Sequence, residues 1–301
     1  MVKSKKARWV AFVFLFLLGV AWVAPIFWLI INSFKYDADF ITSFASIKGP
    51  GDYLSRLIPR KWTVVNYIEM FVGGSGTNTT ANLPAMFKNS FIVSIAVTIG
   101  VLIITSLSAF AYERLNFKNG NKIFWALMYM SMFPNVVALL PMFRIANALG
   151  WVNNLNALIW PSMSGVFNIF LIRNFMKGIP KALDEAATID GANSFQVYRL
   201  IIMPSIKPVM IVVAIFAFNG AWNDYLWPTI VMTDVNNQTL TAGLRLLSGQ
   251  YEQKWAHMIA SCLVSMIPPF LLYLFAQKYF LQGISVQAGV KGCAAQIILL
   301  L

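Results

Sequence analysis

Six long apolar segments constrain the fold of this chain more than any other feature of its sequence. A helix needs about 20 mostly apolar residues to cross the hydrocarbon core of a bilayer, and each segment approaches or exceeds that length. Irregular chain cannot cross lipid, because its backbone N–H and C=O groups would lack hydrogen-bond partners there. We therefore expect an all-α polytopic membrane protein with six transmembrane helices. They cover 9–31, 90–112, 123–143, 155–172, 208–232 and 256–276.

The composition excludes most soluble classes of protein. Hydrophobic residues make up 58% of the chain and charged residues 11%, whereas a soluble domain carries about 25% charged residues. A disordered chain is excluded as well, because it needs low hydrophobicity and high charge. The net charge of +12 would suggest nucleic acid as the partner of a soluble protein. In a membrane protein it indicates basic cytoplasmic loops, so we expect contact with the lipid bilayer and not with nucleic acid.

The distribution of Lys and Arg predicts the orientation in the membrane. Six spans place both termini on one side, together with the loops at 113–122 and 173–207, and that side holds 14 basic residues against 9 on the other. The more basic side faces the cytoplasm, so we expect both termini to be cytoplasmic in a bacterial inner membrane. The basic run before Trp9 resembles the start of a signal peptide. The apolar run that follows exceeds the usual length of about 7–15 residues, however, which favours an uncleaved span.

The spans also predict the organisation of the chain. We expect a cytoplasmic N-terminus and first helix over 1–34, an external loop over 35–88 and a core of five helices over 89–280. A cytoplasmic tail follows over 281–292. The last residues, 293–301, read CAAQIILLL and are too short to cross a membrane, so we interpret them as a cloning scar.

No motif in the sequence indicates catalysis by this chain. The phosphate-binding pattern G-x-x-x-x-G-K-[ST] is absent, so we expect no ATP hydrolysis by the chain itself. The only histidine is His257, and no His/Cys cluster suggests a metal site. Cys262 and Cys293 do not form a disulfide framework. We therefore predict a protein that is not an enzyme and holds no cofactor or metal.

The cytoplasmic loop at 173–207 carries the most specific pattern. Pro180 can open a helix, and Asp184 and Glu185 then lie in its first turns, where the helix dipole favours acidic residues. Gly191 is placed to end that helix in a left-handed conformation.

A second short helix is expected after this turn. Asn193 can cap it together with Gln196, three positions later, and the helix is expected to stop near Pro204. Physical reasoning alone leaves open an amphipathic hairpin on the bilayer surface or a face for a soluble partner. A DNA-binding helix-turn-helix is disfavoured by the acidic residues near the turn.

The residues of this loop resemble a known family. Glu185-Ala186-Ala187, then Gly191, and Ile201-x-Met203-Pro204 are similar to the EAA loop of bacterial ABC importer permeases, with Met203 where Leu is usual. Asp190-Gly191-Ala192 matches too. Further resemblance to MalG-like sugar permeases lies in Arg173-Asn174-Phe175-Met176, in 222–228 (WNDYLWP) and in 288–292 (AGVKG). The likeness extends over about 8–292, and among such systems it points to the permeases of alginate-oligosaccharide importers.

This resemblance implies a fold, partners and roles. The fold is that of a type I ABC importer permease, which pairs with a second, MalF-like permease to form the path for a sugar or oligosaccharide. An external solute-binding protein delivers the sugar, and a cytoplasmic ATPase homodimer binds the ATP and Mg²⁺. In the family the first helix of the EAA loop docks on the ATPase. The residues carried over to that role are Glu185, Ala186, Ala187, Asp190, Gly191 and Ala192, with a further ATPase contact at Gly289, Val290, Lys291 and Gly292.

Polar and aromatic residues in the fifth span are candidates for the substrate path. An acidic residue inside a membrane usually faces a cavity or a partner, and aromatic rings beside amides and carboxylates suit sugars. The alternative is interfacial anchoring by the aromatic residues and hydrogen bonds between helices by the asparagines. The candidates are Asn219, Trp222, Asn223, Asp224 and Tyr225.

Two other functions compete with the importer permease. A stand-alone secondary carrier or channel for a small polar solute would show internal repeats or intramembrane charges, and only Asp224 lies within a predicted span. A polytopic membrane enzyme would need a catalytic constellation, and the sequence offers none.

Overall fold

The computed structural model describes residues 5–37, 39–40, 58–59, 61–72, 82–115, 117–247 and 255–287. Every regular element within these ranges is a helix. The contacts divide the chain into two compact units, which we describe separately. Unit 1 comprises residues 1–84 and 243–267, and unit 2 comprises residues 85–242 and 268–301. The division within the last helix falls at Pro268, the first of two adjacent prolines.

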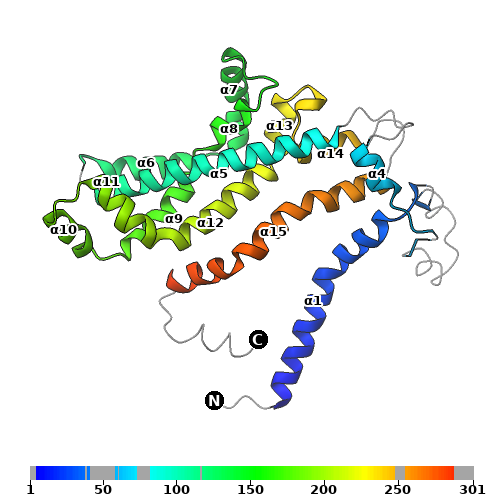
Figure 1. Ribbon diagram of the computed structural model, residues 1–301, viewed down its shortest axis with the longest axis horizontal. Coiled ribbons are helices and arrows are strands. Elements are labelled where there is room, and N and C mark those ends of the chain that lie inside the picture. Colours follow the sequence, from blue (N-terminus) through cyan, green and yellow to red (C-terminus); the bar gives the residue numbers. More distant parts are fainter. Residues whose placement is uncertain are drawn as a thin grey trace. The chain divides into compact units, whose positions relative to one another are not determined.

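Unit 2 is built around two long helices that run side by side (Figure 1). Phe87 of α5 lies against Trp222 of α12, and Phe110 at the far end of α5 lies against Tyr198, so the two helices are antiparallel. Helix α12 packs on α9, α9 packs on α6, and α13 lies against α7 and α8. The helices are α5 (Leu83–Arg114), α6 (Gly120–Ser131), α7 (Asn135–Ala148), α8 (Asn156–Ser162), α9 (Val166–Lys177), α10 (Ala182–Ile189), α11 (Ser194–Val197), η1 (Tyr198–Ile202), α12 (Met203–Trp222), α13 (Leu226–Val231) and η2 (Val235–Asn237).

The core of unit 2 is a continuous apolar cluster between these helices. Buried residues recur at four-residue spacing on α5, which places them on one face of the helix. They pack with apolar residues of α9 and α12, and the side chains of Ile172, Met176, Ile206 and Val213 are fully buried. The buried face of α5 is formed by Val93, Val97 and Val101.

A glycine brings α5 close to the segment between α8 and α9. A Cβ atom added to Gly100 would lie 2.6 Å from Cγ and Sδ of Met163. A small residue at position 100 therefore allows this close approach.

Unit 1 contains α1 (Lys5–Ser33), α4 (Val65–Val72), most of α14 (Leu240–Leu247) and the first part of α15 (Trp255–Gln287). A polar cluster joins the end of α1 to α4. The side-chain amide of Asn66 donates to the backbone oxygens of Ser33 and Lys35, both at 2.8 Å. The hydroxyl of Tyr67 lies 2.7 Å from that of Ser33.

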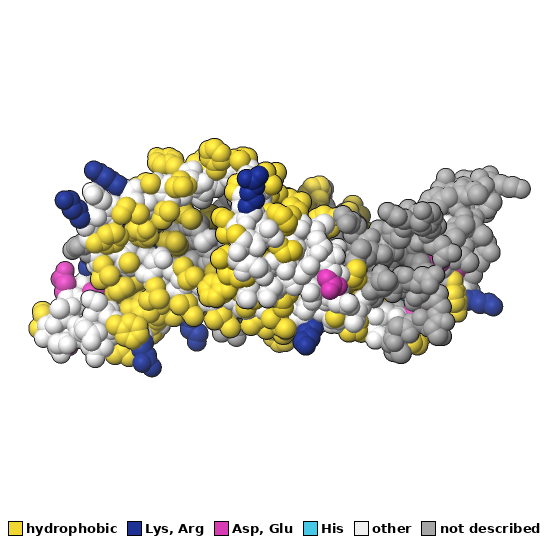
Figure 2. All heavy atoms as spheres, turned by 90° about the horizontal axis from the view of Figure 1, so that it is seen from above, with side chains coloured by type: hydrophobic (Ala, Val, Ile, Leu, Met, Phe, Trp, Pro, Cys, Tyr) yellow, Lys and Arg dark blue, Asp and Glu magenta, His cyan; other side chains and the backbone are white. Residues whose placement is uncertain are grey.

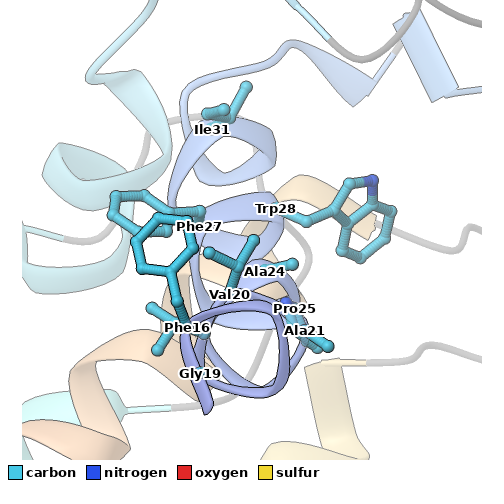
Figure 3. Close-up of a pocket in the computed structure, with 10 residues that line it drawn as sticks. Phe16, Gly19, Val20, Ala21, Ala24, Pro25, Phe27, Trp28 and Ile31 are labelled. Carbon is cyan, nitrogen blue, oxygen red and sulfur yellow. The ribbon is translucent and has the colours of Figure 1, made fainter. Parts of the chain in front are cut away.

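Helix α1 presents apolar side chains on all sides, and none of the residues in its most apolar stretch is buried. Figure 3 shows an open hollow along this helix, where Phe16, Phe27 and Trp28 stand around Gly19 and Ala24. Such an exposed apolar surface is stable inside a bilayer, because lipid chains are as apolar as the side chains and no contact with water has to be removed. Hydrophobic side chains also cover much of the described surface seen in Figure 2.

Fewer helices are long and apolar enough to cross a membrane than the six that the sequence predicts. Four helical stretches within the described ranges qualify: Arg8–Ser33, Leu83–Arg114, Ser194–Val231 and Trp255–Gln277. Helices α6 and α7 make a fifth if they count as one span, although they bend by 98° at their junction. The predicted span at 155–172 is divided into α8 and α9, which are each too short to qualify. The protein is thus an all-helical membrane protein, and the sixth span is not confirmed.

The prediction that the second loop helix stops near Pro204 is wrong. Helix α11 continues through the π-helical turn η1 into α12, with Pro204 near the first position of α12. Proline is tolerated in the first turn of a helix, because an N–H group there has no partner within that helix. The π-helical turn before Pro204 has a different hydrogen-bonding pattern from an α-helix, so Pro204 does not end the helix. The fifth span therefore begins before Pro208, which lies inside α12.

Candidate functional site

Helix α10 forms and ends as its sequence predicts. Asp184 and Glu185 lie in its first turn, and Gly191 after its end has a φ of 87°. The N–H of Gly191 donates to the oxygen of Thr188 at 3.0 Å, and the N–H of Ala192 donates to that of Ala187 at 2.9 Å. These two bonds form a Schellman motif, which needs a left-handed residue at the position of Gly191.

The capping box after this turn is confirmed as well. The side chain of Asn193 accepts from the N–H of Gln196 at 2.9 Å, and the side chain of Gln196 accepts from the N–H of Asn193 at 2.8 Å. The turn between α10 and α11 is therefore held by local bonds on both sides.

Most of α10 is open to solvent, and none of its residues is buried. Glu185, Ala186 and Asp190 are exposed, while Ala187 and Ala192 pack against the core of unit 2. Ile189 is 86% exposed, although a large apolar side chain gains by leaving water. In Figure 1, α10 lies at one end of unit 2, beyond the ends of α5 and α12. The exposed residues thus form a mixed apolar and acidic face that the described residues of unit 2 leave uncovered.

A buried cation fastens α10 to α5. Nε of Arg114, the last residue of α5, lies 3.0 Å from Oδ2 of Asp184. The same guanidinium donates to the backbone oxygens of Ile179 at 2.9 Å and Met176 at 3.3 Å. The sequence prediction missed Arg114, and no spacing rule relates it to a residue so far along the chain.

A second ion pair lies beside the first. Arg173 of α9 bonds to Glu113 at 3.0 Å and to the side-chain oxygen of Asn121. Its guanidinium also lies 4.3 Å from the ring centre of Phe124, within cation–π range. Arg173 therefore ties α9 to both α5 and α6. The sequence places Arg173 in the approach to the loop and does not reveal this contact.

The five candidates for the substrate path do not form one group. Trp222 is buried against the rings of Phe87 and Phe218, in a packing role. The side-chain amide of Asn223 donates to the backbone oxygen of Asn219 at 3.0 Å, within its own helix. Tyr225 is exposed. Asp224 alone among the five lines a cavity in unit 2.

This cavity, called the polar cavity below for the four polar residues among its mostly apolar lining, has a volume of about 400 Å³ and lies between α7, the end of α8 and the break between α12 and α13. Its polar lining comes from Asp224, Asn135, Ser162 and Ser164. The backbone N–H groups of Leu226 and Trp227 donate to the carboxylate of Asp224. That carboxylate therefore starts α13 and also contributes a negative charge to the cavity.

The opposite end of unit 2 holds an ordered loop at 232–241. Asn153, with a φ of 61°, accepts through its side chain from the N–H groups of Thr233 at 2.7 Å and Asp234 at 2.9 Å. Asn89 donates to the backbone oxygens of Asn236 and Gln238. These bonds hold the first part of the loop between the predicted spans at 208–232 and 256–276.

The single histidine has acidic partners in unit 1. Nε2 of His257 lies 2.8 Å from Oε2 of Glu69, and Nδ1 lies 3.6 Å from Oδ2 of Asp37. The N–H of Ala256 donates to Asp37 at 2.8 Å. The sequence shows His257 only as a single histidine, so this cluster was missed.

The proposed tail contact cannot be placed. Gly289, Val290, Lys291 and Gly292 lie outside the described residues, as do 293–301 and the loop residues 248–254.

The comparisons with known proteins define the class. The family model described as "Binding-protein-dependent transport system inner membrane component" matches residues 118–286, which include α10, its turn and the cavity residues. The chain belongs to this family. It is therefore a multi-pass inner-membrane permease subunit of an ABC importer, without catalytic activity, and the nucleotide binds to a partner ATPase.

Particular relatives agree with this assignment. The chain is 30% identical over 279 residues to the trehalose/maltose transport system permease protein MalG of Thermococcus litoralis, covering 92% of this chain and 94% of that protein. It is 33% identical over 230 residues to the sn-glycerol-3-phosphate transport system permease protein UgpE of Salmonella typhi, covering 76% and 82%. In fold it is similar to a chain of a bacterial ABC transporter that imports the acidic polysaccharide alginate, with a TM-score of 0.74, 20% identity and 93% and 99% coverage.

Proposed function

We propose that this permease forms, with a second MalF-like permease, the membrane path of a carbohydrate importer, and that α10 is its docking helix for the ATPase homodimer. The external binding protein that the family requires would deliver the substrate on the opposite side. Membership of a binding-protein-dependent family argues against a stand-alone carrier or channel.

The observation that carries this proposal is the exposure of α10 in combination with its firm attachment. Glu185, Ala186 and Ile189 point away from the core, while Arg114 and the Schellman turn at Gly191 fix the helix in place. A large apolar side chain that a rigid element holds in the open, as α10 holds Ile189, gains by burial against a partner protein. The acidic side chains beside it favour a basic groove on the ATPase.

The topology of the proposal has six spans with both termini in the cytoplasm. Two of these spans are interrupted: α6 with α7, and α8 with α9. Broken helices in membrane proteins occur where they are covered by protein or line a cavity, and the polar cavity lies at α7 and the end of α8. The end of unit 2 that carries α10 would then be cytoplasmic, in agreement with the excess of Lys and Arg in the loops at that end.

For the substrate we propose an uncharged, hydroxyl-rich sugar. The polar cavity offers amide, hydroxyl and carboxylate groups, and Asp224 is the one charged residue in its lining. Such groups bind sugar hydroxyls, whereas a carboxylate with no cation in the same lining repels a uronate or a phosphate. The cavity therefore supports a substrate such as the trehalose or maltose of the MalG relative over the acidic cargo of the other two systems.

The tail at Gly289–Gly292 remains a proposed second contact with the ATPase. It rests on the resemblance of its sequence to the end of MalG-like permeases.

The docking proposal is tested by changing the turn after α10. In Gly191→Val the β-branched side chain must adopt a φ of 87°, which costs about 1–3 kcal/mol of backbone strain. A Cβ at this position meets no atom within 4 Å, so the change strains the turn without causing a clash. We expect sugar uptake per ATP hydrolysed to fall about tenfold in proteoliposomes that contain the whole importer.

The matched control is Gly178→Ala in the same loop. Gly178 has an ordinary φ of −75°, so alanine fits without strain. Wild-type uptake and stimulated ATPase activity in assembled Gly191→Val complexes would contradict the proposal.

A further inference from the structure

We propose that Arg114 is a positioning residue for energy coupling, which links the ATPase-docking helix α10 directly to the long transmembrane helix α5. This inference rests on the docking role proposed for α10. The geometry points to a specific route: a movement of α10 would be passed to α5 through one buried guanidinium.

The contacts of Arg114 lie on both sides of the connection between α9 and α10. The guanidinium pairs with Asp184 in the first turn of α10 at 3.0 Å, and it donates to the backbone oxygens of Met176 and Ile179. A planar guanidinium can hold these acceptors in one fixed arrangement, which an ammonium group cannot do. The side chains of Arg114 and Asp184 are 5% and 18% exposed.

Because the ion pair between Arg114 and Asp184 is buried, separating the two side chains is energetically costly. Removing one partner from a buried ion pair leaves the other charge uncompensated. Arg114 is the one cation within 4 Å of Asp184 among the described residues. The N-terminal turn of α10 therefore stays at the end of α5 as long as this pair is intact.

The base to which α10 is attached is itself rigid. Glu113, the residue before Arg114, pairs with Arg173 of α9, and Arg173 also contacts Asn121 and Phe124 of α6. The adjacent residues Glu113 and Arg114 thus hold α9 and α10 to the same turn of α5. Helices packed in this way have discrete arrangements and do not deform continuously.

The second connection of α10 runs through a less regular segment. After the turn at Gly191 the chain passes through α11 and the π-helical turn η1 before it reaches α12. The wide turn of a π-helix is a known position for local adjustment. The Arg114 link bypasses this segment and reaches the membrane-spanning part of the chain in a single contact.

The test is a double-mutant cycle in the complete importer, reconstituted with its ATPase and binding protein. Arg114→Ala and Asp184→Asn remove the link from opposite sides, and Asp184→Asn keeps the size of the side chain. We expect each change to lower uptake per ATP hydrolysed by about tenfold. We expect the double variant to lose about as much as Arg114→Ala alone, and not about a hundredfold, because the contact of Asp184 with Arg114 is already absent once Arg114 is replaced.

Two further variants separate positioning from folding. Asp184→Glu keeps the charge and should retain most of the coupling, whereas Lys122→Ala removes an exposed cation of α6 and should behave as wild type. The ATPase should still co-purify with the Asp184→Asn variant, because the exposed face of α10 is unchanged. Coupling that is unchanged in both single variants, or losses that multiply in the double variant, would overturn the proposal.

The outcomes also distinguish this inference from the docking proposal. If Gly191→Val uncouples the importer and Arg114→Ala does not, docking at α10 stands and the Arg114 link is wrong. If neither change has an effect, docking at α10 is wrong as well.

Discussion

At the scale of residues, the structure gives the candidates for the substrate path different surroundings. Asn219 and Asn223 are bonded to each other within α12, and Trp222 is part of the core. Asp224 instead faces the polar cavity together with Asn135 and Ser164. The sequence shows that polar residues lie within the apolar fifth span, but only the tertiary fold shows which of them face a cavity.

The proposed sugar contact is tested at Asn135. Its side chain lines the polar cavity, and replacing it with alanine removes one hydrogen-bonding group, worth about 1 kcal/mol. We expect Asn135→Ala to lower the maximal rate of sugar uptake about fivefold at saturating binding protein. Uptake of radiolabelled sugar into proteoliposomes measures this rate.

Ser131→Ala is the matched control for this change. The hydroxyl of Ser131 donates to the oxygen of Met128 within its own helix, so its loss should leave uptake unchanged. Equal rates for Asn135→Ala and wild type would show that the cavity is not part of the path.

At the scale of elements, local signals in the sequence predicted helix α10 and the turn after it well. The acidic first turn of α10, the left-handed Gly191 and the capping box at Asn193 are all read from neighbouring residues, and all are present. The contacts that hold this segment to the molecule were not predictable in this way. Arg114 and Ile179 are 65 positions apart, and His257 and Glu69 are 188 apart, so no periodicity relates them.

The same limit explains the errors in the helices. Hydropathy finds an apolar stretch but does not show where it bends, and the stretches at 123–143 and 155–172 each break into two helices. Pro204 was read as the end of a helix, because the rule for proline does not anticipate a π-helical turn before it.

Close packing of α5 provides a prediction for an element. In Gly100→Val the new side chain would overlap Met163, and the shift needed to relieve the overlap should cost about 1–3 kcal/mol of stability. A Cβ on Gly220 of α12 would meet no atom within 4 Å, so Gly220→Val should cost less. Thermal unfolding of the two purified variants in detergent measures the difference.

An equal melting temperature for the Gly100 and Gly220 variants would contradict the observed approach of α5 to Met163.

At the scale of the whole molecule, the features of unit 2 are arranged in the order that an importer subunit requires. The exposed helix α10, which we propose as the docking helix, lies at one end, a polar cavity is lined by broken helices, and an ordered loop at 232–241 lies at the other end. Family membership establishes the permease role. From the arrangement of unit 2 we expect α10 to meet the ATPase and the loop at 232–241 to meet the binding protein.

Site-directed cross-linking tests which end of unit 2 meets the ATPase. Cysteine is placed at Ile189 on α10 or at Asn237 in the ordered loop of the assembled importer, and a short thiol-reactive cross-linker is added. We predict that Ile189→Cys is joined to the ATPase and that Asn237→Cys is not, because the proposed topology places the two positions on opposite sides of the membrane. A cross-link from Asn237→Cys to the ATPase, or none from Ile189→Cys, would contradict the account.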